Sequence, residues 1–331
     1  MIAVITTIQS PTESVHTLLR HLEPVQSKLI VIGDRKGPSE YPLPGVQFLS
    51  LQDQLTTSFR MASALPTGHY ARKNLGYLIA IGQKPDCIYE TDDDNAPNAA
   101  WRERSLRTHA RKIEARPWAN VYRMFSEANI WPRGFPLDLI ADPKTYRTDA
   151  IETDEVDAPI QRGLANLSPD VDAIWRLVLD RDFAFEEKES VWLPRNTWCP
   201  FNSQTTWWWP EAYPLLYLPS YCSFRMTDIW RSFVAQRCLW ELGYGLVFHP
   251  PEVDQQRNLH SLMRDFEDEV PGYLQNRKIV QALESLSLRS GDGAVSQNLR
   301  TCYEALVRIA AVPEKELGLV DAWLEDLPGL R

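Results

Sequence analysis

Apolar residues in the first hundred positions fall into short runs, each followed by a polar or helical segment. Residues 1–7, 28–34 and 47–51 form such runs, and a capping-box pattern from Ser10 to Glu13 predicts a helix after the first. Continuous apolar runs of this length are typical of strands that are covered on both faces. Their alternation with helical segments predicts an α/β fold with a mostly parallel, doubly wound sheet flanked by helices.

The second half of the chain has a different pattern. A helix is expected from Thr227 or Asp228, either of which could cap it, to a C-terminal Gly243, and residues 246–248 then return as a strand. Residues after 265 have the mixed charge and periodicity of helices. We therefore divide the chain into a domain of residues 1–265 and a C-terminal helical extension of residues 266–331. Residues 99–115 are expected to form a basic helix.

An acidic block follows the apolar residues 87–89. It contains Glu90, Asp92, Asp93 and Asp94. Residues two apart in an extended chain point to the same side, so two of these carboxylates could converge on one cation. A Mg²⁺ or Mn²⁺ ion held by one or two carboxylates keeps coordination positions for substrate phosphates. An acidic, solvated turn is the alternative that this block leaves open.

Several polar residues follow strands of the predicted sheet. Thr6 and Thr7 end the first strand, and Asp34 ends the second. Ligands of such sheets bind outside the carboxyl ends of the strands, where the acidic block would also lie. This shared location favours a binding site over a solvated turn.

Basic residues begin the helical pattern that precedes the acidic block. Arg72, Lys73 and Asn74 stand at its start. Cations are unfavourable at a helix N-terminus, so their presence suggests a nearby anion such as a diphosphate. Two solvated basic side chains would also explain the pattern.

Residues 192–221 are rich in tryptophan and tyrosine and are interrupted by prolines. Their aromatic rings could be buried, or they could stack on sugar rings. Trp207 is therefore a candidate substrate-binding residue, together with Arg225 and Asp172. Asp172 has a simpler explanation as well, because it lies in the first turn of a predicted helix and could cap it.

Composition narrows the classes of function. The chain has 331 residues and a net charge of −9, which argues against a nucleic-acid partner. Its five cysteines are widely spaced, so neither a zinc site nor a disulfide framework is expected. No apolar run approaches the ~20 residues of a membrane span, and residues 2–5 resemble a strand more than a signal peptide. We expect a cytoplasmic protein without an integral membrane segment, with peripheral membrane association and oligomeric state left open.

Over about four-fifths of its length the chain resembles the STELLO family of glycosyltransferases. The matching segments are residues 58–60, 72–78, 131–137, 159–164, 169–172, 200–204 and 227–241. The resemblance implies a fold of the GT-A type. It also implies transfer of a sugar from a nucleotide-sugar donor, with UDP as the expected nucleotide, to a glycan or other hydroxyl acceptor, with Mn²⁺ or Mg²⁺ as cofactor.

The resemblance also implies roles for particular residues. The acidic motif of the family falls on residues 90–93, with Asp92 as the principal metal ligand and Glu90 and Asp94 as further candidates. Asp228 matches the general base of inverting enzymes, although a retaining reaction is left open. A histidine that completes the metal shell matches His260 best and His249 second.

The remaining implied roles concern the donor. Thr6, Thr7 and Asp34 would bind the base and ribose, and Asp93 would support them. Arg72, Lys73 and Asn74 would face the diphosphate. Two other functions remain as alternatives: a nucleotidyltransferase, and a catalytically degenerate module that binds a sugar nucleotide or acts as a scaffold.

Overall fold

The computed structural model describes residues 1–147, 152–256 and 261–327. Within them, eleven strands form one sheet. The strands are β1 (Ile2–Thr7), β2 (Lys28–Gly33), β3 (Val46–Leu49), β4 (Ile88–Thr91), β5 (Asn95–Pro97), β6 (Arg107–Lys112), β7 (Thr153–Asp157), β8 (Ile160–Asn166), β9 (Val191–Leu193), β10 (Thr205–Trp208) and β11 (Leu246–Gln255).

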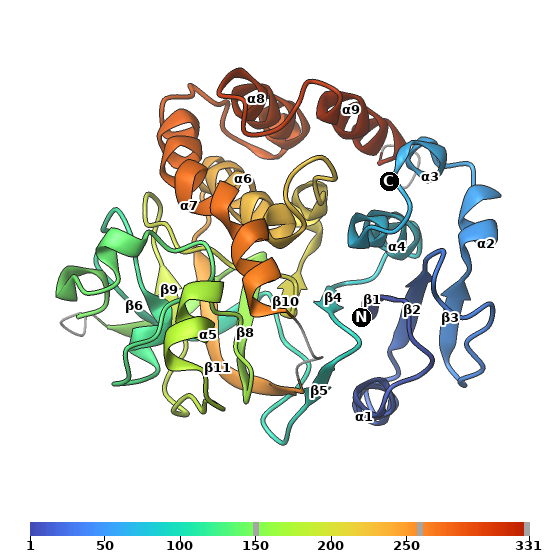
Figure 1. The fold of residues 1–331 in the computed structure, drawn as a ribbon, viewed down its shortest axis with the longest axis horizontal. Helices are drawn as coiled ribbons and strands as arrows, with labels where there is room; N and C mark the ends of the chain where they lie inside the picture. The colour runs from blue at the N-terminus through green and yellow to red at the C-terminus, as the bar shows by residue number, and fades with distance from the viewer. Residues whose placement is uncertain (148–151, 257–260, 328–331) are drawn as a thin grey trace.

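Helices surround this sheet (Figure 1). They are α1 (Glu13–Leu22), α2 (Leu51–Leu55), α3 (Arg60–Ala64), α4 (Lys73–Gly82), α5 (Ala173–Leu179), α6 (Thr227–Glu241), α7 (Leu262–Glu284), α8 (Val295–Arg308) and α9 (Glu316–Asp326). None of the helices in the described ranges combines the length and apolar character needed to cross a bilayer.

The sheet is mixed and confirms the predicted α/β class. Its strands follow the order β3-β2-β1-β4-β10-β8-β11-β9-β6-β7, and β5 pairs with β11. β3, β2, β1 and β4 are parallel to one another, as the apolar runs predicted. β10 then runs antiparallel to both β4 and β8. The carboxyl ends of β1, β2 and β4 therefore meet at one edge of the sheet.

Alternate residues of β1 and β2 enter two different clusters, which places helices on both faces. Val4 and Ile32 pack with Leu75 of α4. Ile5 packs with Leu18 of α1 on the other face. Strands buried on both faces explain why these segments read as continuous apolar runs.

Of the C-terminal helices, α7 and α8 pack along α6, and α9 packs against α8 and α3 (Figure 1). The largest hydrophobic cluster extends from the first strand to α9, where Trp323 is fully buried. The end of α9 lies beside α3, because the Asp326 carboxylate accepts hydrogen bonds from the backbone N–H groups of Arg60 and Met61 at 2.9 and 3.0 Å. The predicted domain boundary at residue 265 falls inside α7, and the division into two parts stays a prediction.

The structure corrects three local predictions. Residues 107–112 are strand β6, not part of a helix, because their backbone pairs with β7 and their charged side chains form ion pairs such as Arg107–Asp157 at 2.8 Å. Tertiary pairing here overrides local preference. α1 is capped by Thr12, not by Ser10. α6 has no side-chain cap, since the 3₁₀ turn η6 (Phe224–Met226) runs directly into it.

Candidate active site

Two cavities lie near the carboxyl ends of the parallel strands. The first, which we call the β1–β2 cavity, has a volume of about 340 Å³ and is lined by residues of β1, β2 and the acidic block. The second, the Asp228 pocket, measures about 110 Å³ and is strongly polar. Of the predicted site residues, Thr6, Thr7, Asp34, Arg72 and Asp93 line the first cavity. Asp92, Arg225 and Asp228 line the second.

Asp34 organises one wall of the β1–β2 cavity. Its carboxylate accepts hydrogen bonds from the backbone N–H groups of Gly68 and His69 at 2.7 and 3.0 Å. The loop that carries Tyr70 is thereby held against the end of β2. On the rim of the same cavity, the exposed ring of Phe224 packs edge-on against His69 and Tyr70, with centroids 5.5 and 4.8 Å apart.

Each residue of the acidic triplet meets a different partner. Asp92 accepts from the buried Lys73 ammonium at 2.6 Å. Asp93 accepts from the Thr7 hydroxyl at 2.5 Å. Asp94 accepts from the Gln255 amide at 3.0 Å. Within the described residues, the direct ion pair seen for this triplet is the one between Lys73 and Asp92.

Burial raises the pKa of all three carboxyls in this triplet. Burial raises the pKa of Asp92, although Lys73 opposes the shift. Burial also raises the pKa of Asp93. For Asp94, burial and the neighbouring Asp92 charge raise the pKa to about 7. Crowded carboxylates with raised pKa values favour a bound cation, because a cation removes both the repulsion and the cost of desolvation.

The donor set suits a hard cation only in part. The described residues contain no group of three or more His, Cys, Asp or Glu side chains arranged to hold a metal ion. Mg²⁺ and Mn²⁺ accept fewer protein ligands, and one or two carboxylates suffice when substrate phosphates complete the shell. Asp92 and Asp94 fit that requirement. His260 lies outside the described residues, and His249 is buried between Gln161 and Ser190 at 2.8 and 2.7 Å.

A buried arginine dominates the Asp228 pocket. Arg133 donates to both Asp228 oxygens at 3.1 and 3.0 Å and to both Asp170 oxygens at 2.8 Å. The fork of the guanidinium suits such paired carboxylates. Arg133 and Gly134 are the two central residues of a tight turn, in which the Phe135 N–H donates to the Pro132 carbonyl at 3.1 Å and the φ of +88° at Gly134 favours glycine. The result is a carboxylate at the start of α6 that is fixed in orientation.

Arg225 and Asp172 lie near this arginine but have other main partners. Arg225 donates to Glu269 at 3.0 and 2.8 Å and lines the pocket. Asp172 is buried and caps α5, accepting from the Trp175 backbone N–H at 2.8 Å. Burial raises its pKa to about 6. The predicted capping role of Asp172 is confirmed.

The two cavities meet at shared elements. The Tyr70 hydroxyl, on the β1–β2 cavity, accepts from the backbone N–H of Asp228 at 3.0 Å. Asp93 lines one cavity and Asp92 the other, although they are adjacent in sequence. A ligand extending from the first cavity past the acidic triplet would therefore approach Asp228.

Four predicted residues make contacts inside the protein. Glu90 is fully buried and pairs with Arg231 at 2.7 Å. Asn74 holds the backbone of Leu218. The indole of Trp207 is buried and donates to Glu252 at 2.8 Å. Arg72, although it lines the β1–β2 cavity, directs its guanidinium to Gln54 and to backbone carbonyls.

Sequence reasoning assigned no role to several residues of the Asp228 pocket. They are Arg133, Ser168, Asp170, Gln204 and Gln255. Arg133, Asp170 and Gln204 stand in segments that matched the STELLO pattern without a role. Their convergence on one pocket is visible only in the folded chain. The sequence feature that could have pointed to these residues is that the segments carrying them all resemble the same family.

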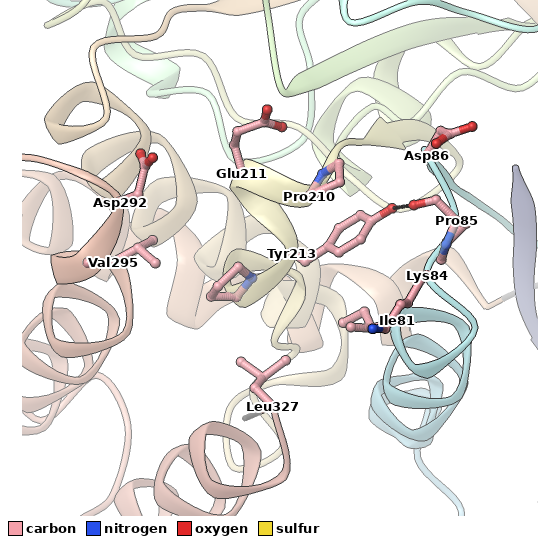
Figure 2. A pocket seen from close by; sticks show the side chains of 12 residues that line it. Ile81, Lys84, Pro85, Asp86, Pro210, Glu211, Tyr213, Asp292, Val295 and Leu327 are labelled. Carbon is pink, nitrogen blue, oxygen red and sulfur yellow. Dashed lines mark hydrogen bonds between the residues drawn. The ribbon is translucent and has the colours of Figure 1, made fainter. Parts of the chain in front are cut away.

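A cavity larger than either the β1–β2 cavity or the Asp228 pocket lies beside the residues that precede β4, and Figure 2 shows side chains that line it. It measures about 640 Å³ and is lined by residues such as Asp86, Glu211 and Asp292. Asp86 precedes β4, whereas the acidic triplet follows it, and the Tyr213 hydroxyl closes one side by donating to the Pro85 carbonyl at 2.8 Å (Figure 2). None of the predicted site residues within the described ranges lines this cavity.

Comparison with known proteins places the chain next to one family. A family model described as STELLO glycosyltransferases matches residues 225–331. Two Arabidopsis thaliana proteins, named "Probable glycosyltransferase STELLO1" and "Probable glycosyltransferase STELLO2", are each 26% identical to it over 347 aligned residues. These alignments cover 98% of this chain but 44% of either relative, so the chain spans less than half their length. The resemblance to the STELLO glycosyltransferases is therefore confirmed.

Proposed function

We propose that this chain is a metal-dependent glycosyltransferase of the GT-A type. It would move a sugar from a nucleotide-diphosphate donor, with UDP as the nucleotide, to a hydroxyl group of a glycan or other acceptor. The observation that carries the proposal is the junction of the two cavities, where Asp92 and Asp228 line one pocket beside a cavity large enough for a nucleoside. The similarity to proteins named as glycosyltransferases supports it.

The β1–β2 cavity would hold the nucleoside. Thr7 and Asp34 offer a hydroxyl and a carboxylate at the strand ends, where nucleotides bind in sheets of this kind. The exposed side chains of Ile8 and Phe224 provide apolar surface on which a flat base could pack. The diphosphate would then lie beside Asp92 and Asp93.

Asp92 and Asp94 would hold Mn²⁺ or Mg²⁺ together with the donor phosphates. When bound, such an ion neutralises the charge that grows on the leaving diphosphate. Lys73 would keep Asp92 in place, since its ammonium also donates to the Thr91 carbonyl at 2.8 Å. Asp93, fixed by Thr7, would order the turn between the two metal ligands.

Asp228 would receive the proton of the acceptor hydroxyl in an inverting reaction. Arg133 sets the direction of its carboxylate. Oδ1 also accepts from the Ile229 backbone N–H at 3.0 Å, and Oδ2 accepts from Ser203 at 3.3 and 3.5 Å, so an acceptor hydroxyl would have to replace the long Ser203 contacts on Oδ2. A fixed orientation of this kind raises the reaction rate, because less entropy is lost in bringing the reacting groups into the correct geometry. Arg225 and Gln204 line the same pocket and would bind sugar hydroxyls.

The direct test is transfer from UDP-sugars in the presence of Mn²⁺. Asp228→Asn is expected to reduce transfer by about 10²–10⁴-fold with donor binding retained. Asp138→Asn is the control. Asp138 is exposed and lines neither cavity, so this variant is expected to leave transfer unchanged. Loss of donor binding in Asp228→Asn would contradict its role as base.

A second candidate function is a module that binds a sugar nucleotide without transferring the sugar. The Arg133 fork on Asp228 favours it, because a carboxylate in two charge-assisted hydrogen bonds is held firmly by its partner. UDP binding without transfer to any acceptor would select this function. Release of diphosphate from a nucleoside triphosphate and a sugar phosphate would instead select a nucleotidyltransferase.

A further inference from the structure

Glu90 is part of the acidic block in sequence but lies inside the protein. Its side chain is fully buried, and its two oxygens accept from three side chains. Arg231 donates to Oε1 at 2.7 Å, Trp208 donates to Oε2 at 3.0 Å, and the Tyr77 hydroxyl donates to Oε1. A carboxylate enclosed in this way has no exposed oxygen for a ligand from solvent.

The main partner of Glu90 belongs to the helix that carries Asp228. Arg231 follows Asp228 by three residues in α6, so the two side chains leave neighbouring positions on the helix surface. Arg231 is itself buried, and its guanidinium lies 5.1 Å from the centre of the Trp208 ring. The Glu90–Arg231 pair therefore joins β4 to α6. It lies two residues before Asp92 on the first element and three residues after Asp228 on the second.

We propose that Glu90 is a positioning residue which, through Arg231, fixes Asp228 of α6 relative to Asp92 at the tip of β4. The catalytic part of this inference rests on the proposed function. A buried ion pair contributes little net stability compared with an apolar pair of similar size, because desolvation offsets its attraction. A short, directional pair does fix the relative position of the two elements that it joins.

The chain contains a matched control for this pair on the other face of the sheet. Glu252 is also fully buried, pairs with Arg104 at 2.5 Å and accepts from the indole of Trp207 at 2.8 Å. Its third donor is a hydroxyl, that of Thr205 at 2.5 Å. Glu252 and Glu90 thus have the same chemistry, but Glu252 joins elements that carry neither Asp92 nor Asp228.

The experiment compares Glu90→Gln with Glu252→Gln. We expect Glu90→Gln to keep the Mn²⁺-dependent affinity for UDP while kcat falls by about tenfold or more, because a small displacement of a reacting group is costly. Glu252→Gln is expected to lose comparable thermal stability and keep kcat. Loss of Mn²⁺-dependent UDP binding in Glu90→Gln would overturn the proposal by making Glu90 a metal ligand. An unchanged kcat in Glu90→Gln would also overturn it, because the Glu90–Arg231 pair would then have only a structural role.

A second measurement does not depend on activity. Amide hydrogen exchange should become faster in the first turns of α6 and at the tip of β4 in Glu90→Gln, and not in Glu252→Gln. Tyr77→Phe removes one donor to Glu90 without leaving an unpaired charge, and it should give the same pattern more weakly if Glu90→Gln does not fold. Unchanged exchange in α6 would overturn the inference. A wild-type chain without transfer would overturn only the proposed function.

Discussion

Asp92, Asp93 and Asp94 are consecutive in sequence, yet the structure gives each a different environment. Lys73, Thr7 and Gln255 are their respective partners. The sequence could place these carboxylates at a strand end, because an apolar run leads directly into them. It could not show which of them would be paired, since every one of those partners is distant along the chain.

Asp94 gives a pH dependence that can be measured. Its folded-state pKa is raised to about 7, so between about pH 4 and pH 7 the folded chain binds a proton that the unfolded chain lacks. Stability from this group therefore falls as the pH rises through that window. Asp94→Asn should stabilise the metal-free protein by about 1–2 kcal/mol at a pH above this window.

Urea unfolding in the presence of a chelator checks this prediction. The stability difference between Asp94→Asn and the wild type should shrink towards zero near the lower end of the window, where both states of the wild type are protonated. A difference that stays constant with pH would contradict the assigned environment of Asp94.

Arg133 should be among the most sensitive charged residues of the chain. Arg133→Met removes the cation that pairs with both Asp170 and Asp228, leaving Asp170 only the longer contact with Arg225 at 3.9 Å, and is expected to cost about 3–5 kcal/mol of unfolding free energy. The exposed Arg277 pairs with Asp138 at 2.5 Å, and Arg277→Met should cost less than about 1 kcal/mol. Equal losses in the two variants, measured by denaturant unfolding, would argue against a special role for Arg133.

Among the elements, those with a clear apolar period were the most predictable. β1 and β2 lie close to where the sequence placed them, and the described residues after 265 are mainly helical as predicted, because burial on a strand face or along one side of a helix leaves a regular pattern. β6 was missed, because its charged residues gain ion pairs with β7 that no local pattern encodes. The same limit applies to the site, since Arg133 and Asp228 are brought together by tertiary packing.

The packing of α4 on the sheet gives a prediction for this element. A Cβ atom at Gly76 would lie 2.6 Å from Val4 Cγ1 and 2.9 Å from Ile32 Cγ1. Gly76→Ala should therefore destabilise the chain by about 1–3 kcal/mol, although alanine favours a helix. Gly318 in α9 has no heavy atom within 4 Å of such a Cβ, and Gly318→Ala should stabilise by about 0.5 kcal/mol. Thermal unfolding measures both, and a stabilised Gly76→Ala would refute this packing.

At the scale of the whole molecule, the C-terminal helices and the sheet share one hydrophobic cluster. Glu316 at the start of α9 also accepts from the backbone N–H groups of Ser220 and Tyr221, in the segment that leads to α6. The sequence indicated helices here but no connection with the site. The buried carboxylate of Glu316 provides that connection, because it fixes the backbone of the segment that leads into α6 and so to Asp228.

A truncated chain of residues 1–265 tests the predicted division into domains. Truncation would remove the partners of Tyr217, Ser220 and Arg60 and expose the inner face of α6. We expect the truncated chain to aggregate or to lack a cooperative thermal transition in calorimetry. A soluble fragment with a sharp transition would show instead that the helical extension is a separate domain.

The central claim is that the acids at the tip of β4 carry a cation and, with it, the phosphates of a nucleotide. Its most direct test is calorimetric titration of UDP with and without Mn²⁺ into the wild type, Asp92→Asn and Asp86→Asn, which alters an acid at the other end of the same strand. We predict Mn²⁺-dependent binding to the wild type and to Asp86→Asn, and its loss in Asp92→Asn. UDP binding of equal affinity with and without Mn²⁺, or Mn²⁺-dependent UDP binding that is retained in Asp92→Asn, would contradict the claim.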